Sequence, residues 1–245
     1  MTFAGAIFKT AIYLLKHQNI KRQCIRLEKQ GKIAERDEIV QKYVPGWASY
    51  MIDLIGSKKA VINVKGTENI PKDGSVVFVA NHQSYLDIPL IITGSQRVMG
   101  FIAKYEILKV PLLSDWMKII QCVFLKRKSP HQSVQAMSKA VKTIKDGYSL
   151  VIFPEGHRSR CNEIREFHHG SFKFAFRSEA PIVPVTIDGS FHLYEEHKKP
   201  MPGTVNLTFH PPIQTAGLTR EQQNNIPDTV FNIIKADLPQ AAAAN

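Results

Sequence analysis

From residue 60 onward the chain alternates short apolar runs with longer stretches of helical periodicity. Runs such as SVVFVAN at 75–81 and SLVIF at 149–153 are short and continuously apolar, which is typical of buried strands. Strands that alternate with helices assemble into a sheet whose faces the helices cover. We therefore expect an α/β fold with a central, largely parallel mixed sheet flanked by helices.

The expected strands lie at 60–66, 75–81, 97–103, 121–127, 149–153, 181–189 and 204–212. Helices are expected over 86–94, 131–147, 170–180 and 218–237, with a helical or irregular stretch at 104–120. No internal repeat interrupts this order, so residues 58–245 are expected to form one main domain.

Residues 1–57 carry a different pattern, which predicts two amphipathic helices. Pro45–Gly46 should bend or interrupt the second helix. The apolar positions are Phe3, Ile7, Ala11, Leu14 and Leu15 in the first helix and Ile39, Val40, Tyr43, Trp47, Tyr50, Met51 and Leu54 in the second. A basic run at 16–32 lies beside them, so the pair fits an interfacial membrane anchor. A helical pair packed on the main core is the alternative, and the two roles can coexist.

A spanning helix is not expected. The most apolar stretch, at 2–15, is interrupted by Lys9 and is shorter than the ~20 apolar residues that a bilayer requires. It also lacks the basic start and the cleavage site of a signal peptide.

The net charge of +11 indicates anionic partners, which include nucleic acid, membrane surfaces and phosphorylated substrates. The sequence lacks the aromatic and basic pattern of an RNA-binding sheet, so we expect no nucleic-acid partner. The three cysteines form no C-x-x-C pair, which suits a reducing compartment. His157, Cys161, His168 and His169 can be read as a zinc site, but their spacing matches no familiar ligand pattern and favours a polar loop without metal.

The stretch NHQSYLD at 81–87 contains His82 and Asp87 between an apolar run and an expected helix. Residues five positions apart in a straight helix point about 140° away from each other, so these side chains could not meet inside one helix. They can meet if His82 stays at the strand end and Asp87 lies near the helix start. A paired imidazole can take a proton from a hydroxyl while the carboxylate fixes its tautomer.

A helix-capping role is the alternative for the same residues. Ser84 and Asp87 have the spacing of a capping box, which would make His82 an incidental loop residue. No G-x-S-x-G or Cys–His signature supplies a protein nucleophile, so a paired His82 would activate a substrate hydroxyl. The local sequence leaves both interpretations open.

A second polar block, SLVIFPEGHRSR at 149–160, ends another buried strand. Glu155 is expected at the open end of the sheet, Gly156 permits a close backbone approach, and Arg158 and Arg160 supply donors suited to phosphate. Open α/β sheets bind ligands beyond the carboxyl ends of their strands, where this block and His82 should both emerge. A surface turn with solvated arginines is the alternative.

Together these blocks resemble the glycerolipid acyltransferase family, most closely its bacterial lysophosphatidic acid acyltransferases. The resemblance covers about residues 60–190. It rests on Asn81–Asp87 for the N-H-x-x-x-x-D block, Lys104 with Lys126 and Arg127 in the acceptor segment, Phe153–Gly156 with Arg158 and Ser159 for the F-P-E-G block, and Val183–Val185 in the fourth block.

The resemblance implies that His82 is a general base and that Asp87 orients it. The base would activate the sn-2 hydroxyl of 1-acylglycerol 3-phosphate for attack on an acyl thioester, which gives phosphatidic acid. The implied substrate-binding residues are Lys104, Arg127 and Arg158 for the acceptor phosphate, Glu155 and Gly156 at the floor of that site, and Ser159.

The resemblance also implies no metal and no bound cofactor, with acyl-CoA or acyl carrier protein as the thioester donor. Residues 1–57 would dock on an anionic phospholipid membrane, at the cytoplasmic face of the cell membrane, as a monotopic or peripheral motif. Residues 58–245 would be the acyltransferase catalytic domain. The competing hypotheses are another acceptor (glycerol 3-phosphate or another lysolipid), a thioesterase, and a non-enzymatic basic membrane-surface module.

Overall fold

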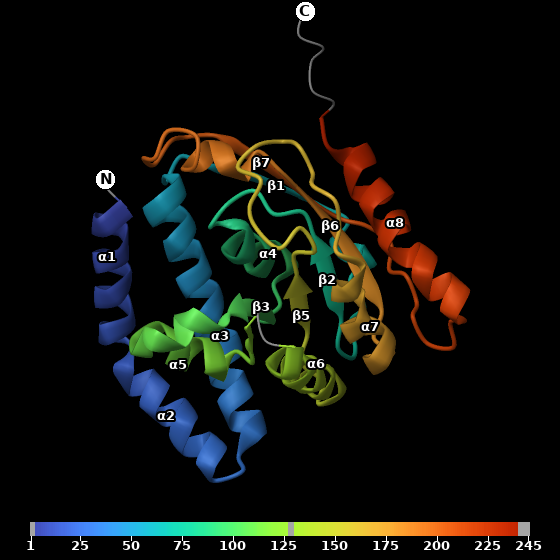
Figure 1. Ribbon diagram of the computed structural model, residues 1–245. Coiled ribbons are helices and arrows are strands. Elements are labelled where there is room, and N and C mark those ends of the chain that lie inside the picture. The colour runs from blue at the N-terminus through green and yellow to red at the C-terminus, as the bar shows by residue number, and fades with distance from the viewer. Residues whose placement is uncertain (1–2, 127–129, 240–245) are drawn as a thin grey trace, which may run out of the picture.

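Seven strands form one sheet in the computed structural model, which describes residues 3–126 and 130–239. The strands are β1 (Val61–Lys65), β2 (Val77–Ala80), β3 (Gly100–Lys104), β4 (Val123–Leu125), β5 (Leu150–Ile152), β6 (Ile182–Asp188) and β7 (Thr204–Phe209). Their order across the sheet is β1-β7-β6-β2-β5-β3-β4 (Figure 1). Every adjacent pair is parallel except β6 and β7, so the predicted α/β fold with a largely parallel mixed sheet is confirmed.

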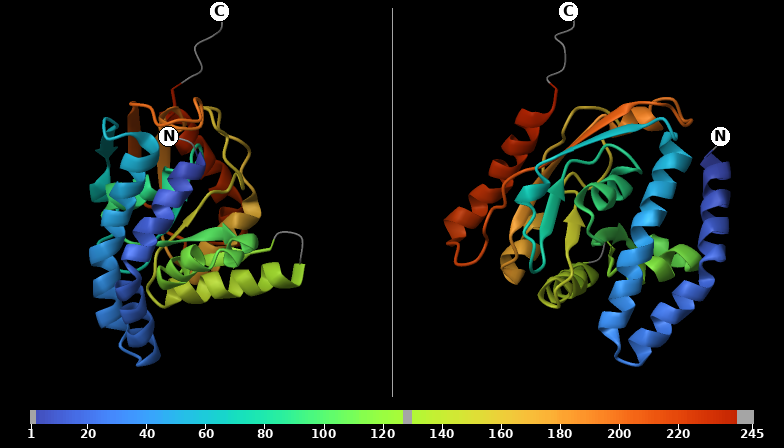
Figure 2. Two further views of the ribbon diagram at one scale, coloured as in Figure 1. Left: turned by 90° about the vertical axis from the view of Figure 1, so that its left-hand side faces the viewer. Right: turned by 180° about the vertical axis from the view of Figure 1, so that it is seen from behind.

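Helices cover both faces of this sheet. They are α1 (Phe3–Lys16), α2 (Gln18–Lys29), α3 (Ile33–Met51), α4 (Asp87–Ser95), α5 (Pro111–Ile119), α6 (Pro130–Lys145), α7 (Lys173–Ser178) and α8 (Arg220–Asp237). Turns of 3-10 helix lie at Thr67–Asn69, Tyr105–Lys109, His169–Phe172 and Ser190–Leu193, and a π-helical turn at Ile52–Gly56 follows α3. Helices α1 to α5 contribute to one buried cluster and α6 to α8 to the other, on opposite sides of the sheet (Figure 2).

The strand β2 is buried on both of its faces. Val77 and Val79 pack into the cluster of α6, α7 and α8, whereas Phe78 and Ala80 pack into the cluster on the other side. Burial on both faces explains why this segment is continuously apolar instead of alternating. Because β2 lies between β6 and β5, packing and strand pairing hold its carboxyl end in place.

The amino-terminal region contains three helices where the sequence predicted two. The basic stretch after the first predicted helix forms a helix of its own, α2. Helix α3 continues through Pro45, so the predicted interruption is wrong, whereas the alternative, a bend at Pro45, stays a prediction. The proline removes one backbone hydrogen bond to the carbonyl of Gln41, but Gln41 is exposed, so water can replace the missing donor.

These three helices pack on the α/β body. Ala6, Cys24, Val44 and Ala48 belong to the same buried cluster as Phe78 of β2. Over the ranges that the structure describes, no helix combines the length and apolar character needed to cross a bilayer. The membrane role of residues 1–57 stays a prediction.

Other element boundaries shift by a few residues. β3 begins at Gly100 instead of residue 97, and the strand predicted at 121–127 shortens to β4. The helix predicted at 170–180 is a 3-10 turn followed by the short α7. The stretch at 104–120 is helical, with Pro111 in the first turn of α5, where its missing N–H needs no partner.

Candidate active site

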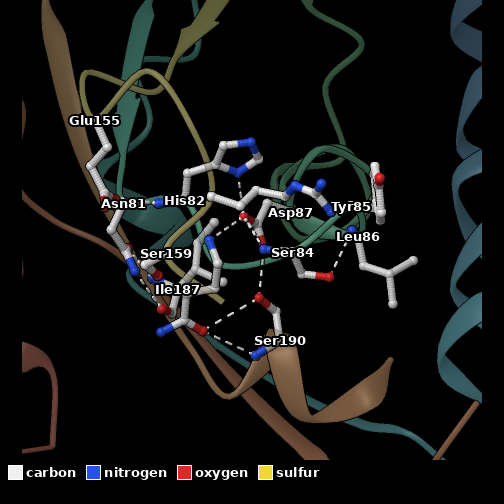
Figure 3. A network of polar contacts seen from close by, with 12 residues as sticks. Asn81, His82, Ser84, Tyr85, Leu86, Asp87, Glu155, Ser159, Ile187 and Ser190 are labelled. Carbon is white, nitrogen blue, oxygen red and sulfur yellow. Dashed lines mark hydrogen bonds and ion pairs between the residues drawn. The ribbon is translucent and has the colours of Figure 1, made fainter. Parts of the chain in front are cut away.

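The side chain of Asn81 anchors the chain where β2 ends. Its amide donates to the Ile187 carbonyl at 2.8 Å, and its oxygen accepts from the Ile187 N–H at 2.8 Å (Figure 3). The side chain thus bonds both backbone polar groups of one β6 residue at the point where the β2 backbone ends. The backbone leaves the sheet at this point, and His82 is the first residue of the turn.

His82 and Asp87 meet across this turn. His82 Nδ1 lies 2.7 Å from Asp87 Oδ2, and Asp87 is the first residue of α4. Only half of the capping box is formed: Asp87 Oδ2 accepts from the Ser84 N–H, but the Ser84 hydroxyl accepts from the Leu86 N–H at 3.0 Å and donates to Glu195. Of the two interpretations of residues 81–87, the structure has the paired imidazole and carboxylate.

The Asp87 carboxylate is fully buried and saturated with donors. Besides His82 it accepts from the N–H groups of Gln83 at 2.7 Å and Ser84 at 2.9 Å, and from the Ser190 hydroxyl at 2.6 Å. Such donors stabilise a negative charge that is shielded from water. Because a carboxylate can only accept, the contact favours the tautomer of a neutral imidazole that carries its proton on Nδ1 and its lone pair on Nε2.

The His82 ring is held in position but remains accessible. It stacks on the ring of Phe153 with 4.1 Å between centroids, and 20% of the side chain is exposed. The second ring nitrogen points away from Asp87 (Figure 3). This arrangement can remove a proton from a hydroxyl that approaches Nε2.

Glu155, in the loop after β5, accepts a hydrogen bond from the backbone of His82. Its side chain is almost completely buried, with Oε1 accepting from the His82 N–H at 2.7 Å and Oε2 from the Arg165 N–H at 3.1 Å. Burial raises the pKa of Glu155 to about 7, although the two backbone N–H groups oppose the shift. Ser159 completes the support, since its N–H donates to the His82 carbonyl at 2.7 Å.

Arg158, predicted to bind the acceptor phosphate, is paired with an acidic residue. Its Nη1 lies 3.1 Å from Glu195 Oε1, and its guanidinium carbon lies 3.4 Å from the centroid of the Tyr85 ring. Tyr85 belongs to the turn between His82 and Asp87. The guanidinium therefore lies against the same turn that carries the base.

The other predicted residues lie at the same edge of the sheet or outside the described ranges. Gly156 adopts a φ of +76° in a tight turn, a left-handed conformation that glycine takes without strain. Lys104 is exposed at the carboxyl end of β3, two strands and thus ~10 Å along the sheet from β2. Arg127 lies outside the described residues.

Two polar partners of this site, Ser190 and Glu195, have no motif in the sequence. Both residues follow β6, about a hundred residues beyond His82. They reach Asp87 and Ser84, in the segment after β2, because β6 lies beside β2. Isolated serine and glutamate residues carry no recognisable spacing. The available signal was positional, because residue 190 follows a predicted strand whose carboxyl end should share the ligand-binding edge.

Two histidines of the segment that could be read as a zinc site, residues 157–169, contact other side chains. His157 contacts Arg165, and His169 Nε2 lies 3.4 Å from Asp228 Oδ1. Within the part of the chain that the structure describes, no three His, Cys, Asp or Glu side chains are grouped to hold a metal ion.

Comparison with known proteins connects this geometry to a family. The sequence model of the Acyltransferase family matches residues 61–188, a range that contains both polar blocks and all but the last strand of the sheet. The chain belongs to the acyltransferase family. Its place there agrees with a buried carboxylate and an accessible imidazole at the carboxyl edge of the sheet.

Similar proteins cover most of this acyltransferase. A "probable 1-acyl-sn-glycerol-3-phosphate acyltransferase" of Mycoplasma pneumoniae is 31% identical over 215 residues, 83% of this chain and 79% of the relative. A protein of the same name from Mycoplasma genitalium is 34% identical over 210 residues, 80% of this chain and 76% of the relative. The crystal structure of the 1-acyl-sn-glycerophosphate acyltransferase PlsC from Thermotoga maritima matches with a TM-score of 0.72 at 26% identity, covering 91% of this chain and 94% of that one.

Proposed function

We propose that this acyltransferase transfers a fatty acyl group from acyl-CoA or acyl carrier protein to the sn-2 hydroxyl of 1-acylglycerol 3-phosphate. The product is phosphatidic acid, for phospholipid synthesis. The observation that carries the proposal is the 2.7 Å contact between His82 Nδ1 and Asp87 Oδ2, which leaves Nε2 available as a base. The names of the Mycoplasma and Thermotoga relatives support this choice of acceptor.

In the proposed reaction the attacking oxygen belongs to the acceptor. His82 Nε2 takes the proton of the acceptor hydroxyl while the hydroxyl oxygen attacks the thioester carbonyl carbon. Asp87 stabilises the imidazolium that forms. The C–S bond then breaks, and the sulfur leaves with the proton that the imidazolium returns. No acyl-enzyme forms in this scheme, because the acceptor hydroxyl attacks the thioester directly and no serine or cysteine serves as the nucleophile.

The acceptor phosphate is assigned to three basic side chains, two of which, Arg158 and Lys104, lie at or after the carboxyl ends of strands, at the same edge of the sheet. Arg158 is the first of them, because its stacking on Tyr85 holds it against the turn between His82 and Asp87. Lys104 and Arg127 complete the proposed set, while Glu155, Gly156 and Ser159 shape the floor of the site. Guanidinium and ammonium groups at this edge suit a phosphate monoester.

Residues 1–57 are proposed to dock this enzyme on the anionic cytoplasmic face of the cell membrane, as a monotopic or peripheral motif. The outward residues Ile7, Phe8 and Leu15 of α1 are more than half exposed, which supports an apolar contact with lipid. Residues 58–245 form the catalytic domain in this proposal.

The proposal is tested by replacing the base. In His82→Ala, transfer from acyl-CoA to 1-acylglycerol 3-phosphate should fall by at least about 10²-fold, because general-base catalysis is lost. His197→Ala is the matched control, since His197 is exposed and contacts Glu196, and it should keep normal activity. Near-normal transfer by a folded His82→Ala protein would contradict the assignment.

The acceptor is tested separately with the unaltered enzyme. We expect the highest kcat/KM on 1-acylglycerol 3-phosphate within a panel that includes glycerol 3-phosphate and a lysolipid without a phosphate monoester. A higher value on another acceptor would change the substrate but not the role of His82. Release of free fatty acid without any acceptor dependence would indicate a thioesterase.

A further inference from the structure

Glu195 is a buried acidic residue in the connection between β6 and β7. Its side chain is 4% exposed, whereas the side chain of the next residue, Glu196, is 44% exposed and lies 2.7 Å from His192. A buried carboxylate is costly unless donors surround it. Glu195 has three of them: the Tyr85 N–H at 2.7 Å, the Ser84 hydroxyl at 2.8 Å and Arg158 Nη1 at 3.1 Å.

These three donors come from two different loops. Ser84 and Tyr85 belong to the turn that follows β2, and Arg158 belongs to the loop that follows β5. Glu195 itself lies in the chain that follows β6. Because β6, β2 and β5 are adjacent in the sheet, one carboxylate joins the loops at the carboxyl ends of three neighbouring strands.

The contact with Glu195 determines how Arg158 is oriented. The guanidinium lies 3.4 Å from the centre of the Tyr85 ring, and stacking of this kind still allows a planar group to rotate over the ring face. The bond from Nη1 to Glu195 prevents that rotation. It uses one of the five N–H donors of the guanidinium, so the others are left to hold an anion.

The charge of Glu195 depends on the same contacts. Burial raises the pKa of Glu195, whereas the Tyr85 N–H, the Ser84 hydroxyl and the positive charge of Arg158 lower it. The carboxylate of Glu195 is the acceptor that these donors share. Its removal would release both Arg158 and the Ser84–Tyr85 turn from this contact.

We infer that Glu195 is a positioning residue that aligns Arg158 and the Tyr85 turn to receive the phosphate of the acceptor beside His82. The inference rests on the proposed function, because it deepens the assignment of the acceptor site. Glu195 acts through Arg158 and does not itself contact the substrate. Its loss should therefore affect the acceptor more than the thioester donor.

The experiment compares Glu195→Gln and Glu195→Ala with Glu196→Gln as the matched control. We expect Glu195→Ala to raise the KM for 1-acylglycerol 3-phosphate about tenfold, because a misaligned Arg158 holds the phosphate less well, with the KM for acyl-CoA unchanged. Glu195→Gln keeps one acceptor oxygen and should show a smaller increase in the same KM. Glu196→Gln should match the unaltered enzyme.

A double-mutant cycle separates positioning from a general structural effect. In an Arg158→Ala background, Glu195→Ala should raise the acceptor KM by a smaller factor, because Arg158 is already absent and only the Tyr85 turn is released. An equal rise in both backgrounds would overturn the inference. So would a fall in kcat with both KM values unchanged.

The two failures can be told apart. If the unaltered protein does not transfer an acyl group to 1-acylglycerol 3-phosphate, the proposed function fails. If it does, and both Glu195 variants keep the normal acceptor KM, only this inference fails. Should Glu195→Ala not fold, the Gln variant alone, with and without Arg158→Ala, gives the same comparison.

Discussion

At the scale of single residues, three buried carboxylates around His82 perform three different tasks. Asp87 contacts the imidazole ring, Glu155 binds the backbone N–H of His82, and Glu195 joins the turn to Arg158. Their donors differ in number and kind, and donors to a carboxylate oppose the rise in pKa that burial causes. Glu155 has only two backbone N–H donors, and its pKa of about 7 lies well above the usual 4.5.

The raised pKa of Glu155 predicts a loss of stability on the alkaline side. Its contribution to the free energy of unfolding is present below pH 4.5 and is lost as the pH rises through about 7, since the unfolded chain releases the proton first. In Glu155→Gln, the fall in the free energy of unfolding between about pH 5 and pH 8 should be smaller by roughly 2 kcal/mol. Urea denaturation at several pH values measures it.

Glu166→Gln provides the control for this prediction, because Glu166 is exposed in the same loop. It should keep the pH dependence of the unaltered protein. The same slope in Glu155→Gln as in the unaltered protein would show that Glu155 does not hold a proton near neutral pH.

At the scale of the elements, α1 has two apolar faces with different surroundings. Ala6 and Leu14 are buried, and the Tyr13 ring stacks on Tyr50 of α3 with 4.5 Å between centroids. On the other face, Ile7, Phe8, Ile12 and Leu15 are exposed, although an amphipathic helix on a protein surface normally presents polar residues to water. The packed face attaches α1 to the body, and the exposed face is the part available to lipid.

This second face predicts the effect of substitution on membrane binding. Replacing Ile7, Phe8 and Leu15 together with serine should weaken binding to anionic phospholipid vesicles by roughly tenfold or more, because binding scales with the apolar area buried in the interface. Vesicle sedimentation measures it. Val134→Ser on α6 is the control, since Val134 is 63% exposed, and unchanged partitioning of the triple variant would reject docking through α1.

At the scale of the whole molecule, a buried arginine connects the amino-terminal helices to the α/β body. Arg36 of α3 is 1% exposed, and its Nη2 lies 2.5 Å from the hydroxyl of Tyr148 and 2.6 Å from Asp37 Oδ1. Tyr148 precedes β5, so the contact crosses from one region to the other. Together with the shared apolar cluster, it indicates that residues 1–57 and the rest of the molecule unfold as one unit.

Arg36→Ala should therefore destabilise the whole protein. We expect the free energy of unfolding to fall by about 3 kcal/mol in a single transition, because the change removes a large side chain that is 1% exposed and leaves a cavity in its place. Chemical denaturation followed by circular dichroism and by tryptophan fluorescence tests it. Lys32→Ala, at an exposed position nearby, should have little effect, and a normal main transition in Arg36→Ala would show that the helices fold separately.

The sequence by itself determined the local features of this protein. The continuously apolar strands β2 and β5, the helices between them and the polar blocks at the strand ends follow from short-range pattern, since burial on two faces and helical periodicity leave a direct mark on the chain. The α/β class and the pairing of His82 with Asp87 as one of two interpretations could be predicted in this way. The extra break after α1 and the continuity of α3 through Pro45 could not, because these helices are stabilised by packing on the α/β body, which leaves no local signature in the sequence.

Only the tertiary structure decided which residues surround His82 and Asp87. Asp87 could have capped its own helix, and it meets His82 because Glu155 and Ser159 hold the His82 backbone while Ser190 takes the other carboxylate oxygen. Glu195 reaches Arg158 for the same reason, since the sheet order places β6 beside β2 and β2 beside β5. These contacts join residues 37 to 103 positions apart and depend on strand order. Strand order is set by the packing of the whole sheet, and no short stretch of sequence determines it.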